Sequence, residues 1–152
     1  EAQLDRFAIR LNLGYPDAAH EVEILFSQND HHPLDDLSVV ATREAVLRLQ
    51  ERIKTVRVEP AVAEYIVRLV AATRDDARLR AGISPRGSLT LYRLAQARAW
   101  RDGREFVLPE DVRALAVPVL AHRLALDTKA RYGGVQHENI IEELLESTPV
   151  PR

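Results

Sequence analysis

One segment of the sequence repeats apolar residues with the period of an α-helix, and it limits the fold more than any other feature. A proline opens the segment at residue 60, and apolar side chains then recur at spacings of three and four residues. A helix of this kind must pack its apolar face against other elements. The residues on this face are Val62, Tyr65, Ile66, Leu69, Val70 and Thr73.

Three further segments supply helices that such a face can pack against. Thr42 is a candidate N-cap for the first of them, Ser84 precedes a proline at the start of the second, and Pro109 opens the third. The stretches "VRVEP" and "REFVL" between them read as short extended connections. Four helices with short connections over residues 42–124 predict a small all-α helical bundle.

The first part of the chain has a different pattern. Residues 7–13, "FAIRLNL", alternate apolar and polar and predict a β-strand, followed by a helix from Asp17 to about Phe26 and a polar loop. No second strand is visible, and a lone strand is not stable. The chain also contains no methionine. We therefore expect an orphan strand that belongs to a sheet further upstream, in a longer protein.

Composition excludes several classes of protein. The formal net charge is −2, which argues against a broad nucleic-acid surface. The absence of cysteine excludes disulfides and thiolate metal sites. No apolar run approaches the roughly 18 residues of a membrane-spanning helix, so we expect a cytoplasmic protein. Because 19 of the 21 cationic residues are arginines, the exceptions being Lys54 and Lys129, a single arginine is by default a solvated surface residue.

Motifs for catalysis are absent. The sequence has no glycine-rich phosphate loop, no dinucleotide-binding fingerprint and no nucleophile elbow. His31 and His32 precede Asp35 and Asp36, but in a polar loop these are ordinary solvent-facing residues, so we predict no metal site. We expect His122, which follows an apolar helix face, to pack or hydrogen-bond.

Two arginines have informative positions. Arg86, in "GISPRGSL", falls in the first turn of a helix, whose N-terminus is already electropositive. That position is favourable if an anion such as phosphate binds there, and otherwise the side chain points to water. Arg6 lies beside the predicted strand, where a long cation can reach a neighbouring subunit; the alternative is a surface charge or a salt bridge with Asp5.

The chain resembles the C-terminal part of the MoxR-type AAA+ ATPases. The resemblance rests on "EAQLDRF", "SPR", "GREFVLPEDV" and "HRL" at their spacings, and it runs nearly end to end. It implies that residues 1–14 are the edge of an ATPase core, 15–41 a linking helix and loop, 42–127 a helical lid domain, and 128–152 a C-terminal helix and tail.

The resemblance also implies roles. Arg6 matches the arginine finger, which acts in trans on the neighbouring subunit, and Arg86 matches the sensor-2 arginine, which contacts ATP phosphates in its own or an adjacent subunit. The parent protein would bind ATP and Mg²⁺, form a homo-oligomeric ring, expected to be a hexamer, and remodel or mature a protein client, such as one with a von Willebrand A-type domain. This chain lacks the phosphate loop, so by itself it should bind no cofactor and be inactive.

Alternatives and one departure accompany this interpretation. A magnesium-chelatase ATPase subunit of the same clade would share both arginines, and a standalone helical protein-interaction module belongs to another class. The family pattern has alanine after "SPR", whereas this chain has Gly87. Glycine in a helix costs up to about 1 kcal/mol relative to alanine, and we expect it to loosen the turn that aims Arg86.

Overall fold

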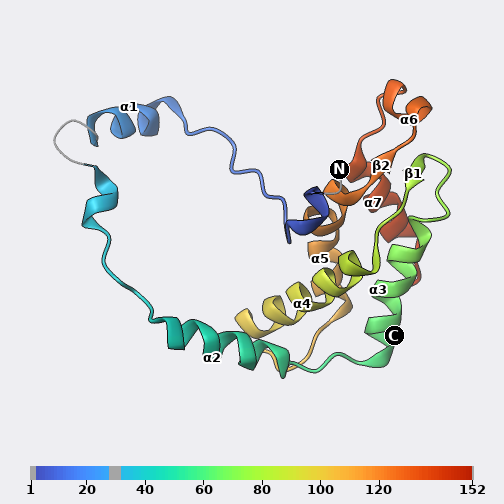
Figure 1. The fold of residues 1–152 in the computed structure, drawn as a ribbon, viewed down its shortest axis with the longest axis horizontal. Coiled ribbons are helices and arrows are strands. Elements are labelled where there is room, and N and C mark those ends of the chain that lie inside the picture. Colours follow the sequence, from blue (N-terminus) through green and yellow to red (C-terminus); the bar gives the residue numbers. More distant parts are fainter. Residues whose placement is uncertain (1–2, 28–31, 152) are drawn as a thin grey trace. The chain divides into compact units, whose positions relative to one another are not determined.

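The computed structural model describes residues 3–27 and 32–151. The chain divides into two units, one of residues 1–10 and 50–152 and the other of residues 11–49. Among the described residues the secondary structure is mostly helical, as predicted (Figure 1). The elements are η1 (Leu4–Arg6), α1 (Ala18–Ser27), η2 (Pro33–Asp36), α2 (Arg43–Lys54), α3 (Pro60–Ala72), β1 (Leu79–Ala81), α4 (Pro85–Arg101), α5 (Pro109–Leu120), η3 (Ala121–Arg123), β2 (Ala125–Leu126), α6 (Thr128–Tyr132) and α7 (His137–Ser147).

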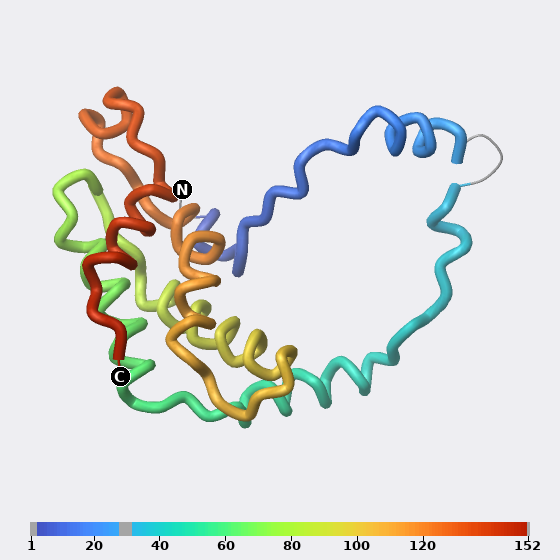
Figure 2. The backbone as a smooth tube through the Cα atoms, turned by 180° about the vertical axis from the view of Figure 1, so that it is seen from behind, coloured from blue at the N-terminus to red at the C-terminus, as the bar shows by residue number. Residues whose placement is uncertain are grey.

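The larger unit is a helical bundle. Helix α4 packs along α5 and against α3, and α7 packs against α5 and α3, as both backbone views show (Figures 1 and 2). The predicted apolar face of α3 is buried, with Tyr65 and Leu69 fully inaccessible to solvent. Helix α7 is part of the same core, since Ile140 and Ile141 are also fully buried.

Short extended segments of the larger unit pair with one another. Residues 57 and 106, in the two predicted extended connections, form a parallel bridge, in which the Arg57 N–H donates to the Glu105 carbonyl at 2.9 Å. The sequence did not predict the small antiparallel sheet of β1 and β2, which pairs Leu79 with Leu126. These two strands are only three and two residues long, too short for an alternating pattern to appear.

The predicted strand at residues 7–13 does not form. This segment has no ladder partner among the described residues, and Leu11 and Leu13 are 69% and 96% exposed. An alternating segment becomes a strand only when another strand satisfies its backbone groups. Instead, the chain makes the 3-10 turn η1 and then runs extended along the bundle, where the Arg10 N–H donates to the Pro118 carbonyl at 2.9 Å.

The smaller unit, residues 11–49, buries no side chain among its described residues. Helix α1 starts where predicted, because Asp17 Oδ1 accepts the His20 N–H at 2.9 Å. The start of α2 is also confirmed, with Thr42 Oγ1 accepting the Ala45 N–H at 3.2 Å. His32 accepts the Leu34 N–H through Nδ1 at 3.1 Å, and its neighbour His31 lies outside the described residues.

Candidate functional site

The N-terminus of α4 is held in place by the residue that precedes its cap. Ile83 is buried, its N–H donates to Thr73 Oγ1 at 3.0 Å, and its carbonyl accepts from Arg74 Nε at 3.1 Å. Ser84 takes the N-cap position with extended backbone angles, and Pro85 is the first helical residue, as predicted. The backbone that leads into α4 is therefore fixed by the side chains of the two residues that directly follow α3.

Ser84 does not cap the helix with its side chain. An N-cap serine ordinarily accepts a backbone N–H from the first helical turn. Here the Ser84 hydroxyl donates instead to Asp5 Oδ2 at 3.1 Å. Ser84, which precedes Pro85 and Arg86, thus contacts the segment that carries Arg6.

Arg86 is exposed in the first turn of α4. Within the described part of the chain, no hydrogen bond or ion pair holds its guanidinium. A second cation lies within electrostatic range, because Arg86 helps to lower the pKa of Arg123. This geometry is unfavourable for a resting ion pair and favourable for an incoming anion.

Gly87 is a packing requirement of this turn, and the expectation that it loosens the turn is not supported. The residue is buried, and a Cβ added there would overlap with Ile83 Cγ2 and lie 3.3 Å from Arg123 Cδ. Glycine lets the side chains of Ile83 and Arg123 approach the helix backbone closely.

We expect Gly87→Ala to destabilise the bundle. Alanine favours the helix by up to about 1 kcal/mol, but overpacking a filled site costs about 1–3 kcal/mol. Thermal unfolding should show a Tm lowered by a few degrees. The matched control is Gly103→Ala, which meets open space but has a φ of +75°; it tests backbone strain rather than packing. A Gly87→Ala chain with a raised Tm would contradict the packing argument.

Arg6 lies at the end of the 3-10 turn η1, with an exposed side chain. No described residue makes a hydrogen bond or ion pair with its guanidinium. The alternative that Arg6 forms a salt bridge with Asp5 does not hold, because Asp5 Oδ1 pairs with Arg123 Nε at 3.2 Å. Arg123 thus contacts the residues on both sides of Arg6, while the Arg6 side chain is free to bind an external group.

Arg123 is the residue that holds this segment. Its guanidinium donates to the Phe7 carbonyl at 2.6 Å and, with longer contacts of 3.4 Å, to the carbonyls of Asp5 and Ala8. It also donates to the Val119 carbonyl of its own helical turn. Only 1% of the Arg123 side chain is exposed, so this is a buried charge with one carboxylate partner. Burial lowers the pKa of Arg123, the Asp5 carboxylate opposes that change, and Arg86 adds to it.

His122 joins the same contacts, as the predicted hydrogen-bonding role requires. Its Nε2 lies 3.1 Å from the Phe7 carbonyl and 2.7 Å from Arg123 Nη1. A neutral imidazole that accepts from Arg123 satisfies the shorter contact, because arginine can only donate. Beside these residues lies a cavity of about 370 Å³ that is also lined by Leu4 and His137.

The "GREFVLPEDV" segment has a structural explanation. Asp111 is buried in the first turn of α5, and its two oxygens each accept from Arg104 at 2.7 Å. Asp111 Oδ2 also accepts the Leu108 N–H at 2.9 Å, and Arg98 Nε lies 3.3 Å from Oδ1. Burial raises the pKa of Asp111, but the hydrogen bonds from Arg104 and Leu108 outweigh it and the net pKa is lowered. This ion pair ties the start of α5 to the turn after α4.

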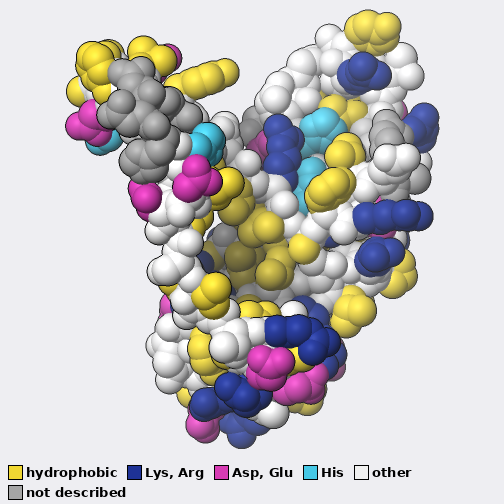
Figure 3. Space-filling model, turned by 60° about the vertical axis from the view of Figure 1, so that its left-hand side comes forward, with side chains coloured by type: hydrophobic (Ala, Val, Ile, Leu, Met, Phe, Trp, Pro, Cys, Tyr) yellow, Lys and Arg dark blue, Asp and Glu magenta, His cyan; other side chains and the backbone are white. Residues whose placement is uncertain are grey.

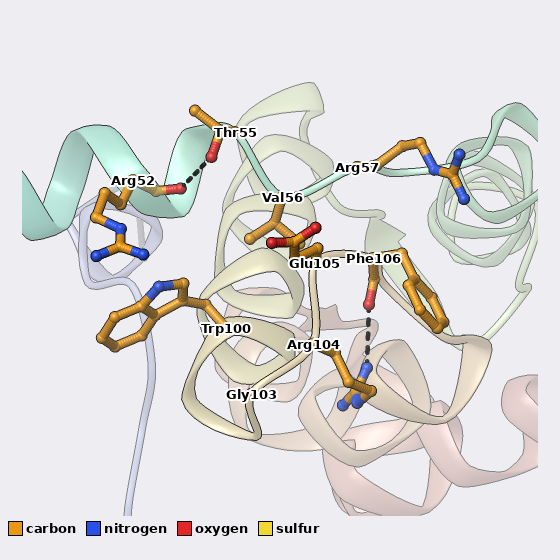
Figure 4. Close-up of a pocket in the computed structure, with 9 residues that line it drawn as sticks. All are labelled: Arg52, Thr55, Val56, Arg57, Trp100, Gly103, Arg104, Glu105 and Phe106. Atoms are coloured by element: carbon orange, nitrogen blue, oxygen red, sulfur yellow. Dashed lines mark hydrogen bonds between the residues drawn. The ribbon is translucent and has the colours of Figure 1, made fainter.

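A second pocket lies at the other end of α4. Its volume is about 730 Å³, and Trp100, Arg52 and Phe106 are among its lining residues (Figure 4). The Arg104 guanidinium hydrogen-bonds to the Phe106 carbonyl at 3.1 Å and is also paired with Asp111. Trp100 is 14 residues beyond Arg86, or about 21 Å along the helix axis, so this pocket and the Arg86 site are separate.

Charge, metal ligands and apolar helices were the other features that could indicate a site among the described residues. On the face drawn in Figure 3, lysine and arginine side chains form several separate groups rather than one continuous basic surface. In the portion of the chain that the structure describes, no group of three or more potential metal ligands comes together. No described helix combines the length and apolar character that crossing a bilayer requires.

Sequence reasoning selected Arg6 and Arg86 but missed the residues that hold them. Arg123 was visible only as part of "HRL", and Asp5 only as a neighbour of Arg6. Neither has a local pattern that predicts burial, because a single arginine after a helix is ordinarily a surface residue. The structure brings the surroundings of Arg6 and Arg86 together through the Ser84–Asp5 hydrogen bond.

Comparison with known proteins identifies the family of the chain. The family model for the AAA lid domain matches residues 71–144. The chain is 39% identical to the Bacillus subtilis protein YeaC, over 99% of this chain and 47% of that protein. It is 34% identical to the chaperone MoxR1 of Mycobacterium tuberculosis, over 100% of this chain and 42% of that protein.

A solved structure gives the same fold. The crystal structure of a Cytophaga hutchinsonii protein, provisionally assigned as an ATPase, superimposes with a TM-score of 0.88 at 30% identity, over 99% of this chain and 48% of that one. The chain thus spans about half the length of the relatives that it matches. It belongs to the MoxR family, and residues 71–144 match the AAA lid domain.

Proposed function

We propose that this chain is the part of a MoxR-type ATPase that carries the lid, the sensor-2 arginine Arg86 and the arginine finger Arg6. The observation that carries the proposal is the state of these two side chains. Each is an exposed guanidinium with no hydrogen-bond or ion-pair partner among the described residues, and each stands on a backbone that buried side chains fix. Some surface arginines of the bundle, such as Arg78 and Arg101, pair with carboxylates, whereas exposed Arg131 has no side-chain partner among the described residues either. What distinguishes Arg6 and Arg86 is the combination of an available guanidinium with a fixed backbone.

Such a pair of available cations suits phosphoryl transfer. The charge that develops on the phosphoryl oxygens in the transition state is stabilised by guanidinium groups that are positioned in advance. The helix N-terminus adds its own attraction for an anion to that of Arg86. ATP and Mg²⁺ would be bound largely by other parts of the parent protein, since the chain has no phosphate loop. The parent protein would form a ring of identical subunits. This ring would use ATP hydrolysis for chaperone-like remodelling or maturation of a client protein.

Arg86→Ala tests the sensor-2 assignment. In the ATPase that carries this chain, we expect weaker ATP binding or slower hydrolysis, because a phosphate-contacting cation is lost. Unfolding of the lid should be unchanged, since no described residue pairs with the Arg86 guanidinium. Steady-state kinetics and thermal unfolding measure the two effects.

Arg101→Ala is the matched control, at the opposite end of α4 and paired with Asp102 at 2.9 Å. It should leave kcat and KM for ATP unchanged. An Arg86→Ala protein that melts several degrees lower, with its kinetics otherwise intact, would make Arg86 a structural residue and remove the assignment.

A further inference from the structure

The carboxylate of Asp5 joins two parts of the molecule that the proposed function treats separately. Its Oδ2 accepts from the Ser84 hydroxyl at 3.1 Å, and its Oδ1 lies 3.2 Å from Arg123 Nε. Ser84 is two residues before Arg86, at the start of α4, and Asp5 is the residue before Arg6. Each of the two arginines therefore lies within two residues of one end of the same contact.

From this geometry we infer that Asp5 is a positioning residue that couples the N-terminus of α4 to the turn that carries Arg6, with Arg123 holding Asp5 in register. The inference rests on the proposed function, because it assigns a consequence to the roles of Arg6 and Arg86. It extends the proposed site to Asp5, Ser84 and Arg123, which would not themselves contact the nucleotide.

The Arg123 contacts fix the backbone on both sides of Arg6. Arg123 donates to the carbonyls of Asp5 and Phe7, and among the described residues it has no hydrogen bond to Arg6, which lies between them. The Arg10 N–H donates to the Pro118 carbonyl, which holds the following residues against the end of α5. A displacement of Asp5 must therefore reorient the turn η1 rather than be absorbed by a loose tail.

The Ser84 hydroxyl donates to Asp5, and its oxygen accepts no backbone N–H from the first turn of α4. An anion bound at that turn therefore does not compete with the Ser84–Asp5 hydrogen bond. Such an anion would reduce the repulsion that Arg86 exerts on Arg123. A weaker repulsion favours the Asp5–Arg123 ion pair when phosphate is present.

The test compares Ser84→Ala and Asp5→Asn with wild type, in the ATPase that carries this chain. Ser84→Ala removes the hydroxyl that reaches Asp5, and Asp5→Asn keeps the shape while removing the charge that Arg123 faces. We expect each variant to lower kcat by about 10- to 100-fold, because a catalytic group is displaced. KM for ATP should stay within about twofold, since no nucleotide contact is lost.

A double variant separates coupling from general damage. If Ser84 acts through Arg6, then Ser84→Ala should lower kcat by less than about twofold in an Arg6→Ala background, because the group that it positions is already absent. Ser88→Ala, one turn further along α4, and Asp75→Asn, on an exposed loop, are the matched controls and should behave as wild type. If Asp5→Asn fails to fold, Ser84→Ala decides the question alone.

The outcomes distinguish this inference from the proposed function. If Arg6→Ala and Arg86→Ala both leave hydrolysis intact, the proposed function fails and the inference fails with it. If those two variants are slow but Ser84→Ala and every folded Asp5→Asn sample match wild type, the inference alone is overturned. An equal effect of Ser84→Ala with and without Arg6 would also overturn it.

Discussion

Arg6→Ala is expected to reduce hydrolysis by the ATPase that carries this chain by about 10³- to 10⁵-fold, the range found for arginines that act in trans in phosphoryl transfer. The physical reason is the loss of a cation that neutralises charge on the phosphoryl oxygens as the bond breaks. Nucleotide affinity should remain close to wild type, because the finger acts mainly in the transition state. Steady-state hydrolysis and equilibrium nucleotide binding measure the two quantities.

Arg10→Ala is the matched control for Arg6→Ala. Arg10 lies four residues further along the same segment, and its side chain is paired with Glu138 at 3.7 Å. This control should retain hydrolysis, since the Arg10 backbone N–H, rather than its guanidinium, contacts α5. A fast Arg6→Ala enzyme would remove the finger assignment, and a slow Arg10→Ala enzyme would show that any charge loss in this segment is harmful.

Asp111→Ala is expected to have the largest effect on stability. The variant removes the carboxylate that holds Arg104 through two hydrogen bonds and leaves a partly buried guanidinium without its main partner. Breaking such a pair costs about 3 kcal/mol, which corresponds to a Tm lowered by roughly 10 °C. Chemical or thermal unfolding of the chain at neutral pH measures this difference.

The effect of Asp111→Ala should depend on pH. Because the pKa of Asp111 is lowered in the folded protein, its contribution is complete above the ordinary aspartate pKa of about 3.9 and is lost as the pH falls through the lowered value. The difference from wild type should therefore shrink in strong acid. Glu110→Ala, at the exposed neighbouring position, is the control and should change stability by less than about 1 kcal/mol at any pH. Equal Tm values for Asp111→Ala and wild type at neutral pH would refute the ion-pair argument.

Helices of the bundle could be predicted because their starts have local signals. Pro60, Pro85 and Pro109 each occupy the first position of a helix, and the apolar spacing that follows Pro60 matches the buried face of α3. These are properties of neighbouring residues, so the sequence contains them directly. The strand expected at residues 7–13 failed for the opposite reason, since strand formation depends on a distant partner.

The candidate site was only partly predictable, for a similar reason. Arg86 is recognisable from its place after a serine and a proline, and Arg6 from "DRF". Arg123 is buried because η3, which contains it, packs against η1 near the start of the chain. The two segments are far apart in the sequence, so no local spacing predicts this contact. The sequence offered Arg6 as a possible ion-pair partner of Asp5, because Arg6 is adjacent in sequence, whereas Arg123 is the arginine that lies next to Asp5 in space.

The buried core has a consequence for how the lid can be isolated. The family model ends at residue 144, yet Leu145 is buried and its carbonyl accepts from Arg113 at 2.8 Å. At the other end, Tyr65 and Ile66 belong to the core but precede residue 71. The segment that the family model matches is therefore shorter than the segment that forms the hydrophobic core. A recombinant lid of residues 71–144 would lack core residues at both ends, whereas one that spans residues 56–148 would retain them.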